Sequence, residues 1–109
     1  MRLYSHADCV SHQTPEGHPE RSDRLAFLLA HLEQTGFTQD HPIREAAPIE
    51  DELVRQAHHP ELLQRLRQSN PREGLTALDP DTWMGPTSMA AALQAAGSVW
   101  QGVQDVVNG

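Results

Sequence analysis

Residues 17–36 read GHPERSDRLAFLLAHLEQTG. Four leucines in this segment have the i, i+3, i+4, i+7 spacing of a helix that buries one face, namely Leu25, Leu28, Leu29 and Leu32. Pro19 suits a first helical position, and Glu20 and Asp23 put negative charge where the helix dipole favours it. Gly36 suits a left-handed residue after the last turn. We therefore predict an amphipathic helix that begins near His18 or Pro19 and ends at Gly36.

Two short strands are expected on either side of this helix. Residues 1–5 contain Leu3 and Tyr4 and show no helical period. Residues 42–48 are bounded by prolines, which permits a brief strand, and the order strand, helix, strand makes it parallel to the first. Residues 6–20 are almost free of apolar side chains and predict a long functional loop.

Three more helices are predicted. The first opens at the acidic residues 50–52 and runs through Ala57, and the second begins at Pro60, so that the two meet at His58 and His59. Residues 69–86 hold several Pro and Gly residues and predict a second functional loop. The last helix starts at a Thr87 or Ser88 cap and extends to Asn108, with apolar residues at alternating steps of three and four.

Small residues form a band along this last helix: Ala90, Ala91, Ala92, Ala95, Ala96 and Gly97. Such a band lets another backbone approach closely, so we expect this helix to be buried.

The composition excludes several function classes. The chain has 109 residues and a formal net charge of −7, and none of its 8 basic residues is a lysine, which disfavours nucleic-acid binding. The longest apolar run has six residues, too few to span a membrane, and the first residues do not form a secretory signal. The single cysteine, Cys9, forms no intrachain disulfide and suits a reducing compartment, so we expect a cytoplasmic protein.

Three clusters of polar residues are candidates for metal binding or catalysis. The loop residues Cys9, His12 and His18 have the donor atoms of a zinc site, although the spacing is also compatible with local hydrogen bonding, which we favour. His58 and His59 lie in a leucine-flanked helical context and are interpreted as structural. The pair Asp79 and Asp81, two residues apart beside Pro80, is interpreted as a turn cap.

The order of these motifs resembles a known family. Three successive segments resemble the N-terminal third of the zinc-dependent histone deacetylase superfamily. They are residues 4–12 with their histidines and Cys9, then Gly17-His18-Pro19-Glu20-Arg21, then Arg24 with the leucine stripe. The likeness is greatest to bacterial acetoin utilization proteins, polyamine deacetylases and class II deacetylases. Residues 57–63, 78–82 and 91–97 are similar to the segments that follow in the family, so the resemblance spans the whole chain.

The resemblance implies roles for a few residues. His18, Pro19 and Glu20 match the first rim loop beside the substrate tunnel, and Arg24 matches the arginine of the internal channel that releases acetate. The alternative for Arg24 is a surface ion pair with Glu20 or Asp23. Asp81 lies in the loop region where relatives bind the substrate backbone. The aspartate of class I enzymes, two residues before Pro86, is Met84 here, which departs from that pattern.

The family's catalytic motifs are missing from these residues. Relatives hold zinc with two aspartates and a histidine and use a histidine pair and a tyrosine for acetyl-amide hydrolysis. None of these motifs occurs in residues 1–109, so we expect no catalytic residue and no cofactor in this chain, and no activity from it alone.

We therefore predict one partial domain, residues 1–109, of α/β class. It is a helix-rich N-terminal fragment of the arginase/deacetylase-like parallel-sheet fold, with one or two short strands and three to four helices. Its apolar faces would lack cover, so we expect association, as a homo-oligomer or with a complementary chain, or a rearranged fold. Two alternative functions remain: a helical oligomerisation module built on the alanine-rich last helix, and a small metal-binding protein.

Overall fold

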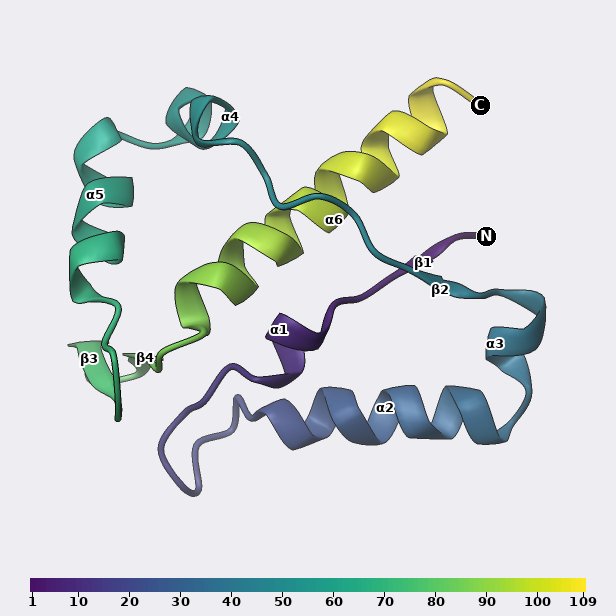
Figure 1. The fold of residues 1–109 in the computed structure, drawn as a ribbon, viewed down its shortest axis with the longest axis horizontal. Coiled ribbons are helices and arrows are strands. Elements are labelled where there is room, and N and C mark those ends of the chain that lie inside the picture. The colour runs from purple at the N-terminus through teal and green to yellow at the C-terminus, as the bar shows by residue number, and fades with distance from the viewer.

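Two long helices and a parallel strand pair set the layout of the chain (Figure 1). The computed structural model describes residues 1–109. In chain order the elements are β1 (Leu3–Tyr4), α1 (Ala7–Val10), α2 (Ser22–Gln34), α3 (Phe37–Asp40), β2 (Ile43–Arg44), α4 (Asp51–Ala57), α5 (Pro60–Ser69), β3 (Thr76–Asp79), β4 (Thr82–Met84) and α6 (Ser88–Val107). The short helix α1 packs between α2 and α6 and joins the two long helices.

The predicted strand pair is present. β1 and β2 are parallel, with Leu3 opposite Ile43 and Tyr4 opposite Arg44, and the amide of Ser5 donates to the Arg44 carbonyl at 3.0 Å. A strand, helix, strand unit of this kind is the starting element of a parallel α/β sheet. The α/β class predicted from the sequence is therefore confirmed, although the structure adds α1, α3 and a hairpin to the predicted elements.

The start predicted for the first long helix, near His18 or Pro19, is wrong. Helix α2 begins at Ser22, with Arg21 as its N-cap, because residues 14–20 are held in a turn of their own. The Thr14 hydroxyl donates to the Glu20 carbonyl, and the Glu20 amide donates to Nδ1 of His18 at 3.1 Å. The predicted end is confirmed, since Gly36 has φ +79°.

The predicted loop 69–86 contains an antiparallel hairpin. Ala77 of β3 pairs with Trp83 of β4, and the register shifts between Ala77 and Asp79. The amide of Asp81 donates to Oδ1 of Asp79 at 2.8 Å, so this aspartate caps the turn, as expected. Pro and Gly residues in the sequence conceal strands that are only four and three residues long.

The segment Ala46–Ile49 crosses α6 closely and is called the crossing segment below (Figure 1). The Ile49 amide donates to the Leu93 carbonyl at 2.9 Å, and the Gln94 side chain donates to the Ala46 carbonyl. A Cβ on Gly97 would lie 2.8 Å from the Ile49 nitrogen and would overlap the Ala47 carbonyl oxygen. The predicted close backbone approach to the small-residue band therefore occurs at Gly97. The predicted burial of the helix is wrong, because Ala90, Ala92 and Ala95 of the band are exposed.

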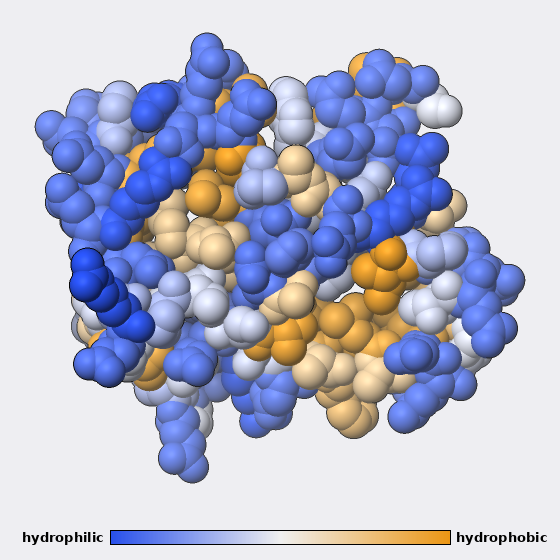
Figure 2. All heavy atoms as spheres, viewed as in Figure 1, coloured by the Kyte–Doolittle hydropathy of each residue, from blue (hydrophilic) through white to orange (hydrophobic).

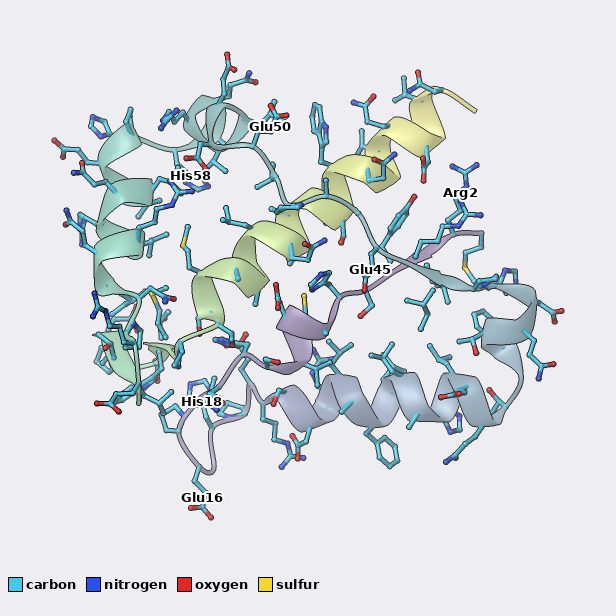
Figure 3. All side chains as sticks on the ribbon, viewed as in Figure 1. Arg2, Glu16, His18, Glu45, Glu50 and His58 are labelled. Carbon is cyan, nitrogen blue, oxygen red and sulfur yellow. The ribbon has the colours of Figure 1, made fainter.

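Both ends of the chain meet at the last turns of α6. The Tyr4 hydroxyl donates to Oδ2 of Asp105 at 2.5 Å, and the Arg2 guanidinium lies 2.8 Å from Oδ1 of the same carboxylate. These two partners and the Gln101 amide lower the pKa of Asp105, the Tyr4 hydrogen bond most of all. Figure 3 shows Arg2 beside the C-terminal half of α6.

Little of the chain is shielded from solvent. Only seven of 109 residues are buried, and the apolar ones among them with side chains are Leu63, Met84 and Ala91. The radius of gyration is 15.3 Å, whereas a compact domain of this length has about 13 Å. The predicted buried leucine stripe is wrong in this chain, since no residue of α2 is buried and Leu28 is 44% exposed. Figure 2 shows apolar residues, in orange, open on this face of the molecule.

No helix of the structure has the length and apolar character that crossing a membrane requires.

Candidate functional site

The loop between α1 and α2, residues 11–21, is called the rim loop below. It is folded by its own hydrogen bonds: the His18 amide donates to the Pro15 carbonyl at 3.0 Å, and Gly17 takes φ +81°, which favours glycine. Glu16 points outward at the tip of this loop (Figure 3). His18 and the exposed residues Pro19 and Glu20 are thus placed by a turn, before the helix begins.

The rim loop is joined to the β3–β4 hairpin through His18. Its Nε2 lies 2.8 Å from the Asp81 carbonyl oxygen, and its Nδ1 accepts from the Glu20 amide. Two residues that are 63 positions apart, both singled out from the sequence, therefore meet in space. The backbone hydrogen bond from Asp81 is the main cause of a lowered pKa at Asp79, and the Asp81 carboxylate itself remains exposed.

A second anchor joins the rim loop to the start of α6. Nδ1 of His12 lies 2.6 Å from Oγ of Ser88, and that hydroxyl also accepts from the Gly85 amide at 2.7 Å. The Thr87 hydroxyl donates to the Ser11 carbonyl at 2.7 Å. Ser88 is only 6% exposed, and its buried hydroxyl has hydrogen-bond partners in both His12 and Gly85. His12 therefore links the rim loop to α6, and the expectation of a hydrogen bond within the loop is wrong for this residue.

The N-terminus of α6 is capped from a distance. The predicted cap, Thr87, occupies the cap position but makes no capping hydrogen bond with its side chain. Asn70, after α5, takes that role: its Oδ1 accepts from the Met89 amide at 3.0 Å and its Nδ2 donates to the Pro86 carbonyl at 3.0 Å. The sequence shows only that an Asn follows a helix, and such a side chain normally forms hydrogen bonds with the backbone of its own turn.

A depression of about 330 Å³ lies between the rim loop, the start of α2 and α6. Its lining includes Arg24 and Glu20, with Cys9, His12 and the small residues Ala91, Ala92 and Ala95 of α6. Arg24 forms no salt bridge; Asp23 pairs with Arg21 at 3.2 Å, and the Glu20 carboxylate lies 3.8 Å from Nε2 of His12. A guanidinium without a carboxylate partner, at the wall of a depression, can bind a carboxylate ligand.

The three residues considered for zinc do not come together. Cys9 faces the Ala91 carbonyl at 3.8 Å, His12 faces Ser88, and His18 faces Asp81. Burial is the main cause of a raised pKa at the Cys9 thiol, which disfavours the thiolate that binds metal. No group of three or more His, Cys, Asp or Glu residues is arranged to hold a metal ion. The residues of this chain do not fit the zinc that the family resemblance implies.

Of the adjacent pair His58 and His59, only His59 makes a structural contact through its side chain. His59 caps α5 by accepting from the Glu61 amide at 3.2 Å, and Pro60 occupies the first turn of that helix. Both His58 and His59 are exposed. Neither contributes to the depression beside the rim loop.

Comparisons with known proteins agree with this geometry. The model of the histone deacetylase domain matches residues 18–109. The chain belongs to the histone deacetylase domain family.

Among its relatives, a probable deacetylase of Archaeoglobus fulgidus is 29% identical over 105 residues, covering 94% of this chain and 29% of that protein. The crystal structure of the HDA15 HD domain superposes with a TM-score of 0.88 at 24% identity, over 99% of this chain and 32% of that one. The chain thus spans about a third of the length of these proteins. Its fold follows that of the HDA15 HD domain, so the rearranged fold considered from the sequence is not observed.

Proposed function

We propose that this chain is the N-terminal part of a zinc-dependent deacetylase domain and that it supplies the substrate rim, without catalytic residues of its own. The observation that carries the proposal is the family match over residues 18–109 in a chain with no group able to hold zinc. The proposed reaction of the complete domain is hydrolysis of acetyl-lysine or acetyl-polyamine amides, with zinc supplied by residues outside this chain.

The proposal gives each rim residue a task. His18 holds the hairpin by its 2.8 Å contact with the Asp81 carbonyl, so that the rim loop and the hairpin form one edge for a substrate. Pro19 and Glu20 form the exposed side of that edge. Arg24 binds the carboxylate product in the adjacent depression, which is supported by its freedom from salt bridges and by the small residues of α6 opposite.

Two finer assignments belong to the same proposal. We place the chain among the members like bacterial acetoin utilization proteins, polyamine deacetylases and class II deacetylases, on the basis of the motifs within residues 4–36. We also place it in the cytoplasm, because its one cysteine suits a reducing compartment.

An activity and metal assay tests the central claim. The purified chain is incubated with zinc, its metal content is read by native mass spectrometry, and hydrolysis of an acetyl-lysine reporter is followed. We expect no stoichiometric zinc and no hydrolysis. Hydrolysis by this chain alone that a chelator abolishes would overturn the proposal.

The product-binding role of Arg24 has its own test. Acetate is titrated into the labelled chain while amide resonances of Ala91 and Ala95 are recorded. These resonances should shift in the wild type and stay still in Arg24→Gln. Equal shifts in both proteins would remove Arg24 from the proposed channel.

A further inference from the structure

The depression between the rim loop, α2 and α6 contains two opposite charges that do not neutralise each other. The Arg24 guanidinium and the Glu20 carboxylate both line it, yet they form no salt bridge with one another. Arg21, the remaining cation of the lining, pairs with Asp23 at 3.2 Å. The depression therefore offers a ligand one free guanidinium and one carboxylate.

Backbone hydrogen bonds fix the position of Glu20 at the edge of this depression. Its amide donates to Nδ1 of His18 at 3.1 Å, and its carbonyl accepts from the Thr14 hydroxyl. Its carboxylate lies 3.8 Å from Nε2 of His12, which is too long for a hydrogen bond. Glu20 is thus positioned through its backbone, and its carboxylate oxygens remain available to a ligand.

The His12 ring keeps the Glu20 carboxylate turned toward the depression. The Gly85 amide donates to the Ser88 hydroxyl at 2.7 Å, and that hydroxyl lies 2.6 Å from Nδ1 of His12. Since the hydroxyl accepts from the amide, its own hydrogen goes to Nδ1, and the hydrogen of the neutral ring is assigned to Nε2. This N–H attracts the Glu20 carboxylate from 3.8 Å without neutralising its charge.

The rest of the lining is small and mostly apolar. It includes Leu25 of α2 and three alanines of α6, Ala91, Ala92 and Ala95. Burial is the main cause of the raised pKa of the Cys9 thiol, so this side chain adds no charge. The volume of about 330 Å³ is at the lower end of ligand pockets, which span about 300–1,000 Å³. The space suits a small molecule with a short carbon chain between two polar ends.

A carboxylate alone does not match this pattern of charge, because Arg24 attracts it and Glu20 repels it. An amino acid satisfies both residues. Its carboxylate accepts two hydrogen bonds from the guanidinium, and its ammonium group donates to the Glu20 carboxylate. The opposite orientation brings like charges together, so the two residues also set the direction in which the ligand binds.

We propose that this depression binds a small free amino acid, with the carboxylate on Arg24 and the ammonium group on Glu20. The inference rests on the proposed function in one respect, the use of Arg24 as a carboxylate-binding residue, and it adds zwitterions to the acetate proposed above. Glu20 is the residue that distinguishes the two classes of ligand.

Pairs of ligands that differ only by an amino group test this specificity. Glycine, β-alanine and 4-aminobutyrate are titrated into the labelled chain beside acetate, propionate and butyrate, and the amide resonances of Ala91 and Ala95 are recorded. In the wild type, the amino acid whose length fits the depression should bind about threefold more tightly than its matched acid, which is the scale of one exposed ion pair. No preference for the amino acid at any of the three lengths overturns the inference.

Glu20→Gln should change the two affinities in opposite directions. The amino acid should bind about threefold more weakly because its ammonium group loses a partner, and the matched acid should bind more tightly because the repulsion is gone. The Glu20 side chain is exposed and forms no hydrogen bond, so the amide spectrum of the variant should show the wild-type fold. Equal effects on both ligands would overturn the inference.

Glu33→Gln is the matched control for the loss of charge. Glu33 also lies on α2 but outside the lining of the depression. It follows Arg24 by about 14 Å of helix, beyond the Debye length of about 10 Å at 0.1 M salt. Both affinities should change by less than about 1.5-fold. An effect as large as that of Glu20→Gln would mean that net charge, and not a local contact, sets the preference, and the inference would fail.

Arg24→Gln separates this inference from the proposed function. The variant should lose the binding of both ligand classes, and an Arg24→Gln chain that still prefers the amino acid overturns the inference. Acetate binding that depends on Arg24, without any preference for amino acids, refutes the inference and leaves the proposed function intact. Hydrolysis of an acetyl-lysine reporter by the chain alone, together with a preference for amino acids that depends on Glu20, refutes only the proposed function.

Discussion

Replacing Gly97 by alanine tests how the crossing segment is held against α6. The added Cβ would overlap the Ala47 carbonyl oxygen and lie 2.9 Å from the Pro48 carbonyl carbon, and both neighbours are backbone that cannot rotate away. The segment must move, which costs about 1–3 kcal/mol of overpacking. It also loses the hydrogen bonds from Ile49 to Leu93 and from Gln94 to Ala46, worth about 1 kcal/mol each.

Alanine returns about 1 kcal/mol through its higher helix propensity. The net expectation for Gly97→Ala is a loss of about 2–4 kcal/mol in the free energy of unfolding. The assay is urea unfolding followed by far-UV circular dichroism, at one protein concentration for all variants because association shifts apparent stability.

Gly102→Ala is the matched control on the same helix, because its Cβ would meet nothing within 4 Å. It should raise the free energy of unfolding by about 0.5–1 kcal/mol. If Gly97→Ala is as stable as Gly102→Ala, the crossing segment does not pack against α6 as described, and the reasoning is refuted.

Three further predictions concern polar contacts. The pKa of Asp105 is lowered in the folded state, so its carboxylate stabilises the fold above the pKa of the unfolded chain, and the wild type loses this stabilisation as pH falls below about 4. Asp105→Asn should lack this pH-dependent part of the stability. Urea midpoints between pH 3 and 7 measure it, and parallel pH profiles of the two proteins would contradict it. Asn70→Ala should cost about 1–2 kcal/mol through the lost cap of α6, with Asn108→Ala, at the far end of the helix, as a near-neutral control in the same unfolding assay. Arg67→Lys should weaken the contact between α4 and α5, because the guanidinium donates to both oxygens of Asp51 at 2.6 Å, whereas an ammonium makes a single point contact; a double-mutant cycle with Asp51→Asn that shows no coupling would contradict this.

Periodicity made much of the fold predictable. The leucine spacing of α2, Pro60 at the start of α5 and the alternating steps of three and four in α6 are local signals, and each corresponds to a helix in the structure. The parallel pairing of β1 and β2 followed from their order around α2.

The remaining features depend on contacts between distant parts of the chain. Pro19 and Glu20 look like a first helical turn, but Thr14 and His18 hold them in a different turn. Asn70 is next to one helix and caps another. Nothing in the composition of α6 indicated that Gln94, Gly97 and Asp105, and not its valines, would face the chain, because that choice depends on contacts with the crossing segment and with Tyr4.

The candidate site was predictable only in part. His18 and Asp81 were singled out separately, and their contact could not be read from a separation of 63 residues. Ser88 was missed as a partner of His12 because an isolated serine before a helix normally indicates only a cap.

The contacts that hold this chain together have a consequence for the order in which it folds. Tyr4 binds Asp105 across 101 positions, and His12 binds Ser88 across 76. The contacts that the first strand and the rim loop make with α6 therefore cannot form until α6 has been synthesised. Chains rich in such distant contacts fold slowly and leave apolar surface open in the meantime. During translation, α1, which packs against both α2 and α6 in the folded chain, would therefore contact only α2 until the last helix emerges.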